Sequence, residues 1–197
     1  MFSMCLCVFI LLHRHIENIE TKYQFEQIPN KIDCKKMTTH LQQMLQLVDE
    51  LFNIKNDPSQ LDVTPIVMEQ LNELHPSTLS EEVIGDGPVC WILLIPSTLE
   101  TMEDFLSGKI SESEILKQSV EAKNNSQKFE AIYLCSAIVL PEFRKKGIAK
   151  KVTLKAVAAM RKDFDIKFVY SWPFSEEGKK LSALIGELTA LPVRIKN

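Results

Sequence analysis

The residues best suited to chemistry lie in one short segment, Arg144-Lys145-Lys146-Gly147-Ile148-Ala149-Lys150. Three adjacent cations precede a glycine, and the helix-forming run from Ala149 to Phe164 follows at once. The first turn of a helix has backbone N–H groups without intrahelical partners and carries about half a positive charge. Such a turn beside cationic side chains binds phosphate well. The segment therefore predicts a pyrophosphate-binding loop, with a solvated cluster of surface charge as the alternative.

An apolar, β-forming segment precedes this loop. Residues Ala131 to Val139 have the length and composition of one buried strand, and Pro141 marks its exit. Gly147 permits a tight turn, and Ala149 permits close approach of another group. The cations stand at the helix end that the dipole disfavours, so a bound anion would offset the cost of placing them there. This order of strand, proline, loop and helix favours the anion site.

These residues resemble the GNAT superfamily of acyl-CoA-dependent N-acyltransferases. The family's phosphate loop has Arg or Gln, two residues, Gly, one residue, then Gly or Ala. Arg144, Gly147 and Ala149 match it. The preceding Val139-Leu140-Pro141-Glu142-Phe143 matches the hydrophobic-x-Pro-Glu-aromatic lead-in that often accompanies that loop. The resemblance is concentrated between Ala131 and Phe164 and is absent before residue 89.

The resemblance implies an α/β (α+β) fold with a mixed, mostly antiparallel sheet, a splayed parallel strand pair and flanking helices. Acetyl-CoA, the acyl donor, would lie between the strand at Ala131 to Val139, the signature strand of this resemblance, and a parallel strand at Lys167 to Phe174. Backbone groups at Ile138, Val139 and Leu140 would pair with its pantetheine arm. The phosphates would be held by Arg144, Lys145, Lys146, Gly147, Ile148, Ala149 and Lys150.

The implied reaction is acetyl transfer from acetyl-CoA to an amine acceptor of unknown identity. Many family members carry a Tyr that protonates the leaving thiolate, on the helix after the second strand of the splayed parallel pair. The matching segment Ser175 to Leu181 has none. Tyr170 is predicted as the catalytic residue in its place, with a core Tyr as the alternative and Ser136 and Ser171 as weaker donors. A catalytically silent domain that binds acyl-CoA or a protein partner is the alternative function.

The remaining candidates for chemistry lie on or beside the signature strand. Glu130 and Glu142 stand at its opposite ends and are the candidates for a general base, with surface carboxylates as the alternative. Cys135 lies in an apolar run without a neighbouring His, which favours an inert buried thiol. The insertion from Ser97 to Lys128 is expected to help build the acceptor side of the site.

Length, composition and charge indicate one globular unit. The chain has 197 residues, 45% of them hydrophobic, and a net charge of −3. An acidic chain lacks the broad basic surface of a general nucleic-acid binder, so no nucleic-acid partner is expected. Five cysteines, two of them in apolar runs, predict free thiols in a reducing, cytoplasmic compartment. Their spacing and the scattered histidines predict no metal site.

The first 36 residues differ from the rest in pattern. We expect residues 1–36 to be an upstream extension, which a misassigned start codon would explain, and residues 37–197 to be the GNAT-like acyltransferase domain. The apolar run from Met4 to Leu12 is shorter than the roughly 20 residues that span a bilayer, which argues against stable membrane insertion. A membrane-attached tail is the alternative.

Hydrophobic periodicity and turn signals predict the other elements. They comprise a helix through Leu41 to Phe52, a helix opened by Thr64-Pro65, a strand at Val89 to Pro96, helices capped by Ser97 with Glu100 and by Ser111 with Glu114, a loop at Ala122 to Lys128, a helix capped by Ser175 that buries Leu181, Leu184, Ile185 and Leu188, and a closing strand at Leu191 to Ile195.

Overall fold

The computed structural model describes residues 39–52, 61 and 65–196. The predicted boundary between residues 36 and 37 lies outside these residues, as does the Met4 to Leu12 run. Within the described part of the chain, no helix is both long and apolar enough to cross a membrane.

A five-stranded sheet in the order β1-β2-β3-β4-β5 forms the centre of the described fold. β1 (Leu79–Ile84) pairs antiparallel with β2 (Gly87–Ser97), which pairs antiparallel with β3 (Ala131–Val139). β4 (Phe168–Ser171) pairs parallel with β3, and β5 (Val193–Ile195) pairs parallel with β4. The predicted mixed α/β class is therefore confirmed, with two antiparallel and two parallel pairings.

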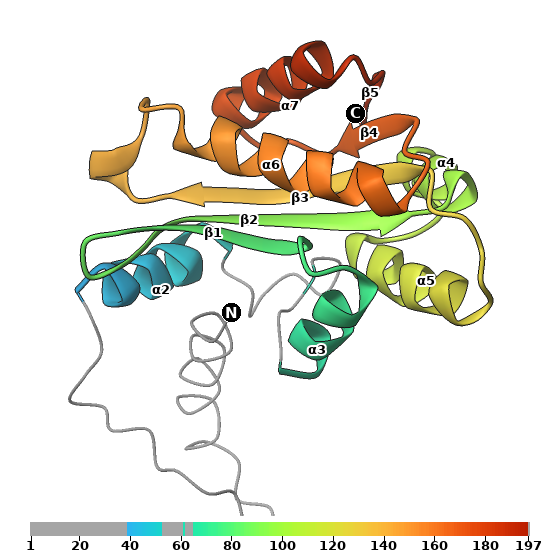
Figure 1. Cartoon of the computed structure of the whole chain (residues 1–197), viewed down its shortest axis with the longest axis horizontal. Coiled ribbons are helices and arrows are strands. Elements are labelled where there is room, and N and C mark those ends of the chain that lie inside the picture. The colour runs from blue at the N-terminus through green and yellow to red at the C-terminus, as the bar shows by residue number, and fades with distance from the viewer. Residues whose placement is uncertain (1–38, 53–60, 62–64, 197) are drawn as a thin grey trace, which may run out of the picture.

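Helices cover both faces of this sheet. They are α2 (Thr39–Phe52), α3 (Pro65–Leu74), α4 (Leu99–Leu106), α5 (Glu112–Asn124), α6 (Ile148–Asp163) and α7 (Glu176–Thr189). Figure 1 shows α6 and α7 on one side of the sheet and α2, α3 and α5 on the other. Met102 and Phe105 of α4 pack in the same buried cluster as Leu116 of α5. Two cores therefore lie on opposite faces of the sheet. One lies under α4 and α5, and the other lies under α6 and α7.

The face under α6 and α7 is largely aliphatic. Its core combines Ile92 and Leu94 of β2 with Val157 of α6 and Ile185 of α7, all buried. Small residues of α6, such as Ala156, bring the helix close to the sheet. This packing holds the start of α6 beside the end of β3, where the predicted loop lies.

Strand β3 has the predicted boundaries, Ala131–Val139, because its apolar run ends at a proline. The second strand of the parallel pair is shorter than predicted. β4 has four residues instead of the eight from Lys167 to Phe174, and Phe174 beyond it is exposed. β1 was not predicted, because Glu81 and Glu82 interrupt its apolar pattern.

Two predicted caps have different outcomes. The capping box of α5 is confirmed, since the Ser111 N–H donates to the Glu114 carboxylate at 2.7 Å. This hydrogen bond from the Ser111 backbone lowers the pKa of Glu114. The cap of α4 is Thr98 and not Ser97, because its hydroxyl accepts from the Thr101 N–H at 3.1 Å. Ser97 ends β2 instead, so its side chain turns into the core.

Helices α5 and α7 also differ from prediction in detail. The Ala122 to Lys128 segment was predicted to be a loop, but α5 continues through Asn124 because Ala122 is buried against the core. Ser175 caps α7 as predicted and accepts from the Gly178 N–H at 3.0 Å. Leu188, predicted to be buried, is exposed, whereas Ile185 one turn earlier is fully buried as predicted.

Candidate functional site

The predicted anion loop forms a compact turn between β3 and α6. A short 3-10 turn over Pro141–Phe143 leads out of the strand. Lys145 and Gly147 then adopt left-handed φ angles of 61° and 75°. Helix α6 begins directly at Ile148, and its first hydrogen bond runs from the Lys151 N–H to the Gly147 carbonyl at 3.0 Å. The N–H groups of Ile148, Ala149 and Lys150 precede that bond in the first turn of α6, and they are the groups that an anion would contact.

The cations of the loop are all exposed, and three of them have partners. The Arg144 Nε donates to the Val139 carbonyl at 3.0 Å. The Lys146 ammonium lies 4.9 Å from the centre of the Phe143 ring. Lys151 forms an ion pair with Glu82 of β1 at 2.6 Å. Among the described residues, Lys145 and Lys150 form no ion pair, so the loop keeps positive charge available for a ligand.

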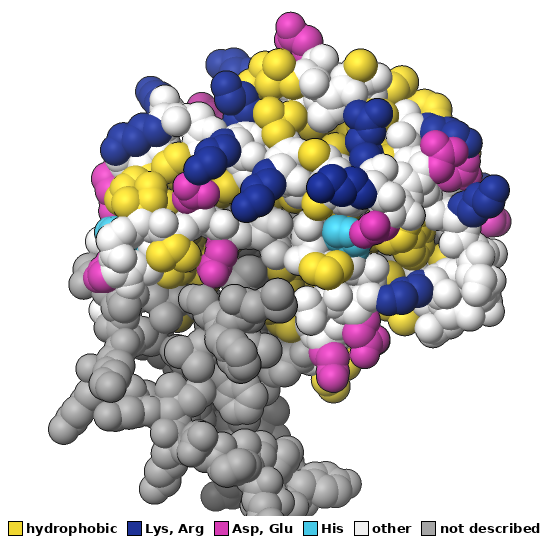
Figure 2. All heavy atoms as spheres, in the orientation of Figure 1, with side chains coloured by type: hydrophobic (Ala, Val, Ile, Leu, Met, Phe, Trp, Pro, Cys, Tyr) yellow, Lys and Arg dark blue, Asp and Glu magenta, His cyan; other side chains and the backbone are white. Residues whose placement is uncertain are grey.

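Positive charge gathers on one side of the molecule. Every charged residue from Arg144 to Lys162 is a cation, although the whole chain has a net charge of −3. In Figure 2, Lys and Arg side chains gather over the upper half of the visible face, where Figure 1 shows α6. Cationic side chains at the start of a helix are repelled by the positive end of its dipole. An anion bound there would be stabilised by the side chains and by the dipole.

The edge of β3 that faces away from β2 carries backbone polar groups. The Leu140 N–H donates to the Val89 carbonyl at 3.0 Å, so Leu140 faces β2. Hydrogen-bonded and non-hydrogen-bonded positions alternate along an antiparallel ladder. With the continuous register of this segment, Ile138 faces β2, while Val139 and Ala137 direct their N–H and C=O groups away from it. The bond that Val139 accepts from Arg144 is consistent with this assignment.

Two of the three residues predicted to contact pantetheine have their side chains in the core. Ile138 and Leu140 are buried with Met44 of α2 and Val89 of β2. Of the three predicted positions, only Val139 therefore offers backbone groups to a ligand beside β3. The structure adds Ala137 to it, a residue that the sequence did not single out.

Strands β3 and β4 part after a short pairing. Their register ends at Leu134 with Ser171, and the second half of β3 has no partner other than β2 among the described strands. The β2–β3 register shifts at this point, which makes Cys135 an extra residue in β3. Such a bulge bends the strand. The parting of the parallel strands thus begins at Cys135.

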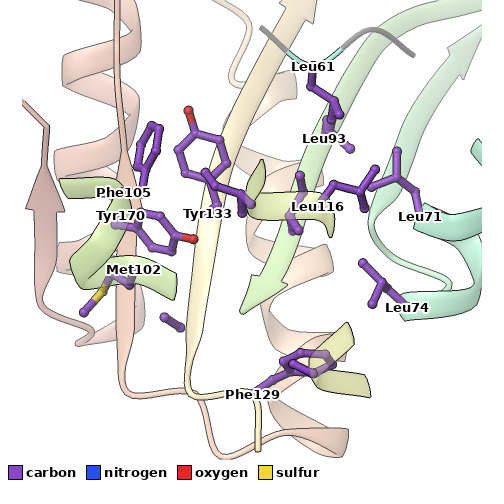
Figure 3. Packing of buried hydrophobic residues seen from close by; sticks show 14 residues of the cluster. Leu61, Leu71, Leu74, Leu93, Met102, Phe105, Leu116, Phe129, Tyr133 and Tyr170 are labelled. Atoms are coloured by element: carbon purple, nitrogen blue, oxygen red, sulfur yellow. The ribbon is translucent and has the colours of Figure 1, made fainter. Parts of the chain in front are cut away.

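Tyr170 lies fully inside the core beside this point. Its hydroxyl is 2.9 Å from the Ser97 hydroxyl, and its ring centre is 5.0 Å from that of Tyr133. Figure 3 shows both rings with Phe105 of α4. Burial raises the pKa of Tyr170 above its ordinary value, so the hydroxyl stays protonated. Its catalytic role stays a prediction.

The two other predicted donors lie next to this point, because Ser136 follows Cys135 and Ser171 is the last paired residue of β4, whereas the two predicted bases lie at the ends of β3. The Ser171 hydroxyl is buried and lies 3.0 Å from Ser182 of α7. Glu130 pairs with Lys167 at the start of β3. Glu142 is exposed beyond the opposite end of the strand and lines a hollow against α2.

The structure brings a different carboxylate to the bulge. Glu112, the first residue of α5, is 8% exposed. It accepts hydrogen bonds from the Tyr133 hydroxyl at 2.7 Å and from the Cys135 thiol at 3.5 Å. Burial and Glu112 together raise the pKa of the Cys135 thiol well above its ordinary value. No local signal in the sequence distinguishes Glu112 from the neighbouring helix-start carboxylate Glu114.

Comparison with known proteins adds no relative. No family model matches the chain, and no curated protein matches it.

Proposed function

We propose that this chain is a GNAT-type domain that binds acyl-CoA and transfers an acetyl group from acetyl-CoA to an amine. The observation that carries the proposal is the cationic turn from Arg144 to Lys150, which leads from a bulged strand directly into the first turn of α6. A pyrophosphate at that turn satisfies the free helix amides and relieves the repulsion among the loop cations.

The strand edge supports the same orientation of the ligand. With the pyrophosphate at α6, the pantetheine amides pair with Val139 and Ala137, whose backbone groups face away from β2. The thioester then lies toward Cys135, where β3 and β4 part. The Arg144 Nε donates to the Val139 carbonyl, so pantetheine binding at Val139 exchanges that bond for one to the pantetheine.

A catalytically silent acyl-CoA-binding domain is the second candidate. It is favoured by the first turn of α7, which carries Glu176 and Glu177 and no Tyr. It is also favoured by Tyr170, which has no exposed surface and already contacts Ser97. Both candidate functions require the loop for acyl-CoA binding. They differ only in whether the chain transfers the acetyl group to an amine.

Titration calorimetry of coenzyme A into the full chain tests the binding step. Gly147→Asp adds a negative charge at the proposed pyrophosphate position and should weaken binding roughly ten- to a hundredfold, since a charged hydrogen bond contributes about 1.5–3 kcal/mol. Gly108→Asp is the matched control. Gly108 has a φ of 78° against 75° for Gly147, and an added Cβ meets no atom within 4 Å.

The control variant should bind coenzyme A like the parent, because both substitutions impose the same backbone strain. Equal affinity in parent and Gly147→Asp would remove the loop from the site. Absence of coenzyme A binding by the parent would overturn the proposed function as a whole.

Tyr170→Phe tests the proposed acid. Assayed with acetyl-CoA and a panel of primary amines, it should lower turnover by about 10²- to 10⁴-fold and leave acetyl-CoA affinity nearly unchanged. Phe preserves the packing on Phe105 and Tyr133, so the effect isolates the hydroxyl. Unchanged turnover would assign Tyr170 to the core, and absence of transfer by the parent would favour the silent domain.

A further inference from the structure

Glu112 is an unusual carboxylate in this fold. Among the described residues, it and His75 are the only acidic or basic side chains that are buried. His75 pairs with Asp163 at the surface, whereas none of the ion pairs formed by described residues includes Glu112. A buried carboxylate without a cation is costly to keep ionised unless hydrogen-bond donors surround it. Its retention inside the core therefore calls for an explanation beyond packing.

Three donors converge on this carboxylate from separate parts of the chain. Oε1 accepts from the Tyr133 hydroxyl at 2.7 Å and from the Cys135 thiol at 3.5 Å. Oε2 accepts from the Leu61 N–H at 3.3 Å. The carboxylate is also at the first position of α5, where the helix dipole stabilises negative charge. These contacts fix the position of the Glu112 carboxyl group without a cation beside it.

That fixed point coincides with the place where the two parallel strands part. Cys135 is the extra residue of the bulge, and Leu134 just before it is the last residue of β3 paired with β4. Cys135 and Ser136 are partly exposed. The Glu112 carboxyl group is therefore hydrogen-bonded to Cys135, the residue at which β3 and β4 separate, and the partly exposed Cys135 and Ser136 lie next to solvent.

We propose that Glu112 is the catalytic base that takes the proton from the acceptor amine. This inference rests on the proposed function. An amine attacks the thioester carbonyl carbon through its nitrogen, so that a C–N bond forms and the C–S bond breaks. The nitrogen's proton passes to Glu112, and the departing thiolate takes a proton from Tyr170 or water. The products are an amide and a thiol, and Glu112 and Tyr170 return to their starting states by proton exchange with water.

The assignment also explains why the two carboxylates predicted from the sequence are unsuited to this role. Glu130 precedes β3 and is held by Lys167, while Glu142 lies beyond its other end on the α2 side. Neither contacts the bulge. Glu112 reaches it from α5, the helix of the insertion between β2 and β3.

The test compares Glu112→Gln with the parent in the full chain. Acetyl-CoA affinity is measured by calorimetry, and thiol release is measured with acetyl-CoA and a panel of primary amines. Gln keeps the size of the side chain and one acceptor oxygen, so affinity should stay within about twofold while turnover falls by about 10²- to 10⁴-fold. Glu121→Gln, the same change at an exposed position of α5, should leave both quantities unchanged.

Glu112→Asp separates loss of the base from a folding defect, because it keeps a carboxylate and shortens the side chain by one methylene group. It should transfer acetyl groups faster than Glu112→Gln. Turnover in Glu112→Gln equal to the parent would overturn the assignment while the proposed function stands. A parent that binds acetyl-CoA and acetylates no amine would overturn it in favour of the silent domain. Loss of folding in both variants would assign Glu112 to stability, and a parent without acetyl-CoA binding would overturn the proposed function itself.

Discussion

On one side of the sheet, α6 and α7 pack aliphatic side chains such as Leu94 and Val157 against the strands. On the other side, α4 and α5 cover a face that also buries Tyr133, Tyr170 and Glu112. Polar groups are costly to bury unless they are hydrogen-bonded, and these are, to one another or to Ser97. The comparison indicates that both faces are packed cores, but that the α4–α5 face also buries hydrogen-bonded ionisable side chains.

The largest expected effect is on the aliphatic face. Leu94 is 1% exposed, and Leu94→Ala should lower the free energy of unfolding by about 2–5 kcal/mol, because the side chain leaves a cavity that the core fills incompletely. Chemical denaturation measures it. Leu188→Ala, the same substitution at an exposed position of α7, should change stability by less than about 0.5 kcal/mol. Similar costs at both positions would contradict the assigned packing.

The elements that the sequence predicted well are those whose signal is local. The apolar run of β3 ends at a proline, and Ser175 caps α7 through its own hydroxyl, so neighbouring residues determine both boundaries. The mixed sheet was expected from the family resemblance that the β3–loop–α6 motif carries, and the strand pairings confirm it. The cationic loop was likewise predicted at the end of β3, because its residues are contiguous.

The features that the sequence did not reveal depend on contacts between distant segments. Glu112 and Glu114 both stand in the first turn of α5, and one is buried because Tyr133 and Cys135 of β3 reach it. The bulge at Cys135 likewise arises from pairing with β2. Local sequence patterns therefore could not identify Glu112, the catalytic carboxylate that we propose, whereas they could identify the anion loop.

The second prediction concerns Cys90, an ionisable group on the aliphatic face. Burial, with a smaller effect from Glu82, raises the pKa of Cys90 from 9.0 to about 12. Above pH 9 the unfolded chain releases this proton while the folded chain keeps it, so stability is present below that pH and is lost as the pH rises toward 12. The loss is up to about 1.4 kcal/mol per pH unit.

Cys90→Ala isolates that contribution. Denaturation between pH 7 and 11, at steps of roughly one pH unit, should give a shallower decline in the variant above pH 9 and parallel curves below it. Other buried groups, including Tyr133 and Tyr170, also have raised pKa values, and they contribute equally to both proteins. Identical slopes above pH 9 would show that Cys90 ionises in the folded state and that this face is wetter than the structure indicates.

The smallest expected effect distinguishes the two hydroxyls where β2 meets α4. The Thr98 hydroxyl caps α4 at the Thr101 N–H, while the Ser97 hydroxyl belongs to the α4–α5 face through Tyr170. Thr98→Ala should cost about 1 kcal/mol, the usual value of a lost N-cap, and should speed hydrogen exchange at the Thr101 amide. Ser97→Ala should leave that exchange rate unchanged, because it removes a partner of Tyr170 and no helix bond. Faster exchange in Ser97→Ala alone would make Ser97 the cap, and Tyr170 would then lose the hydrogen bond that we assign to it.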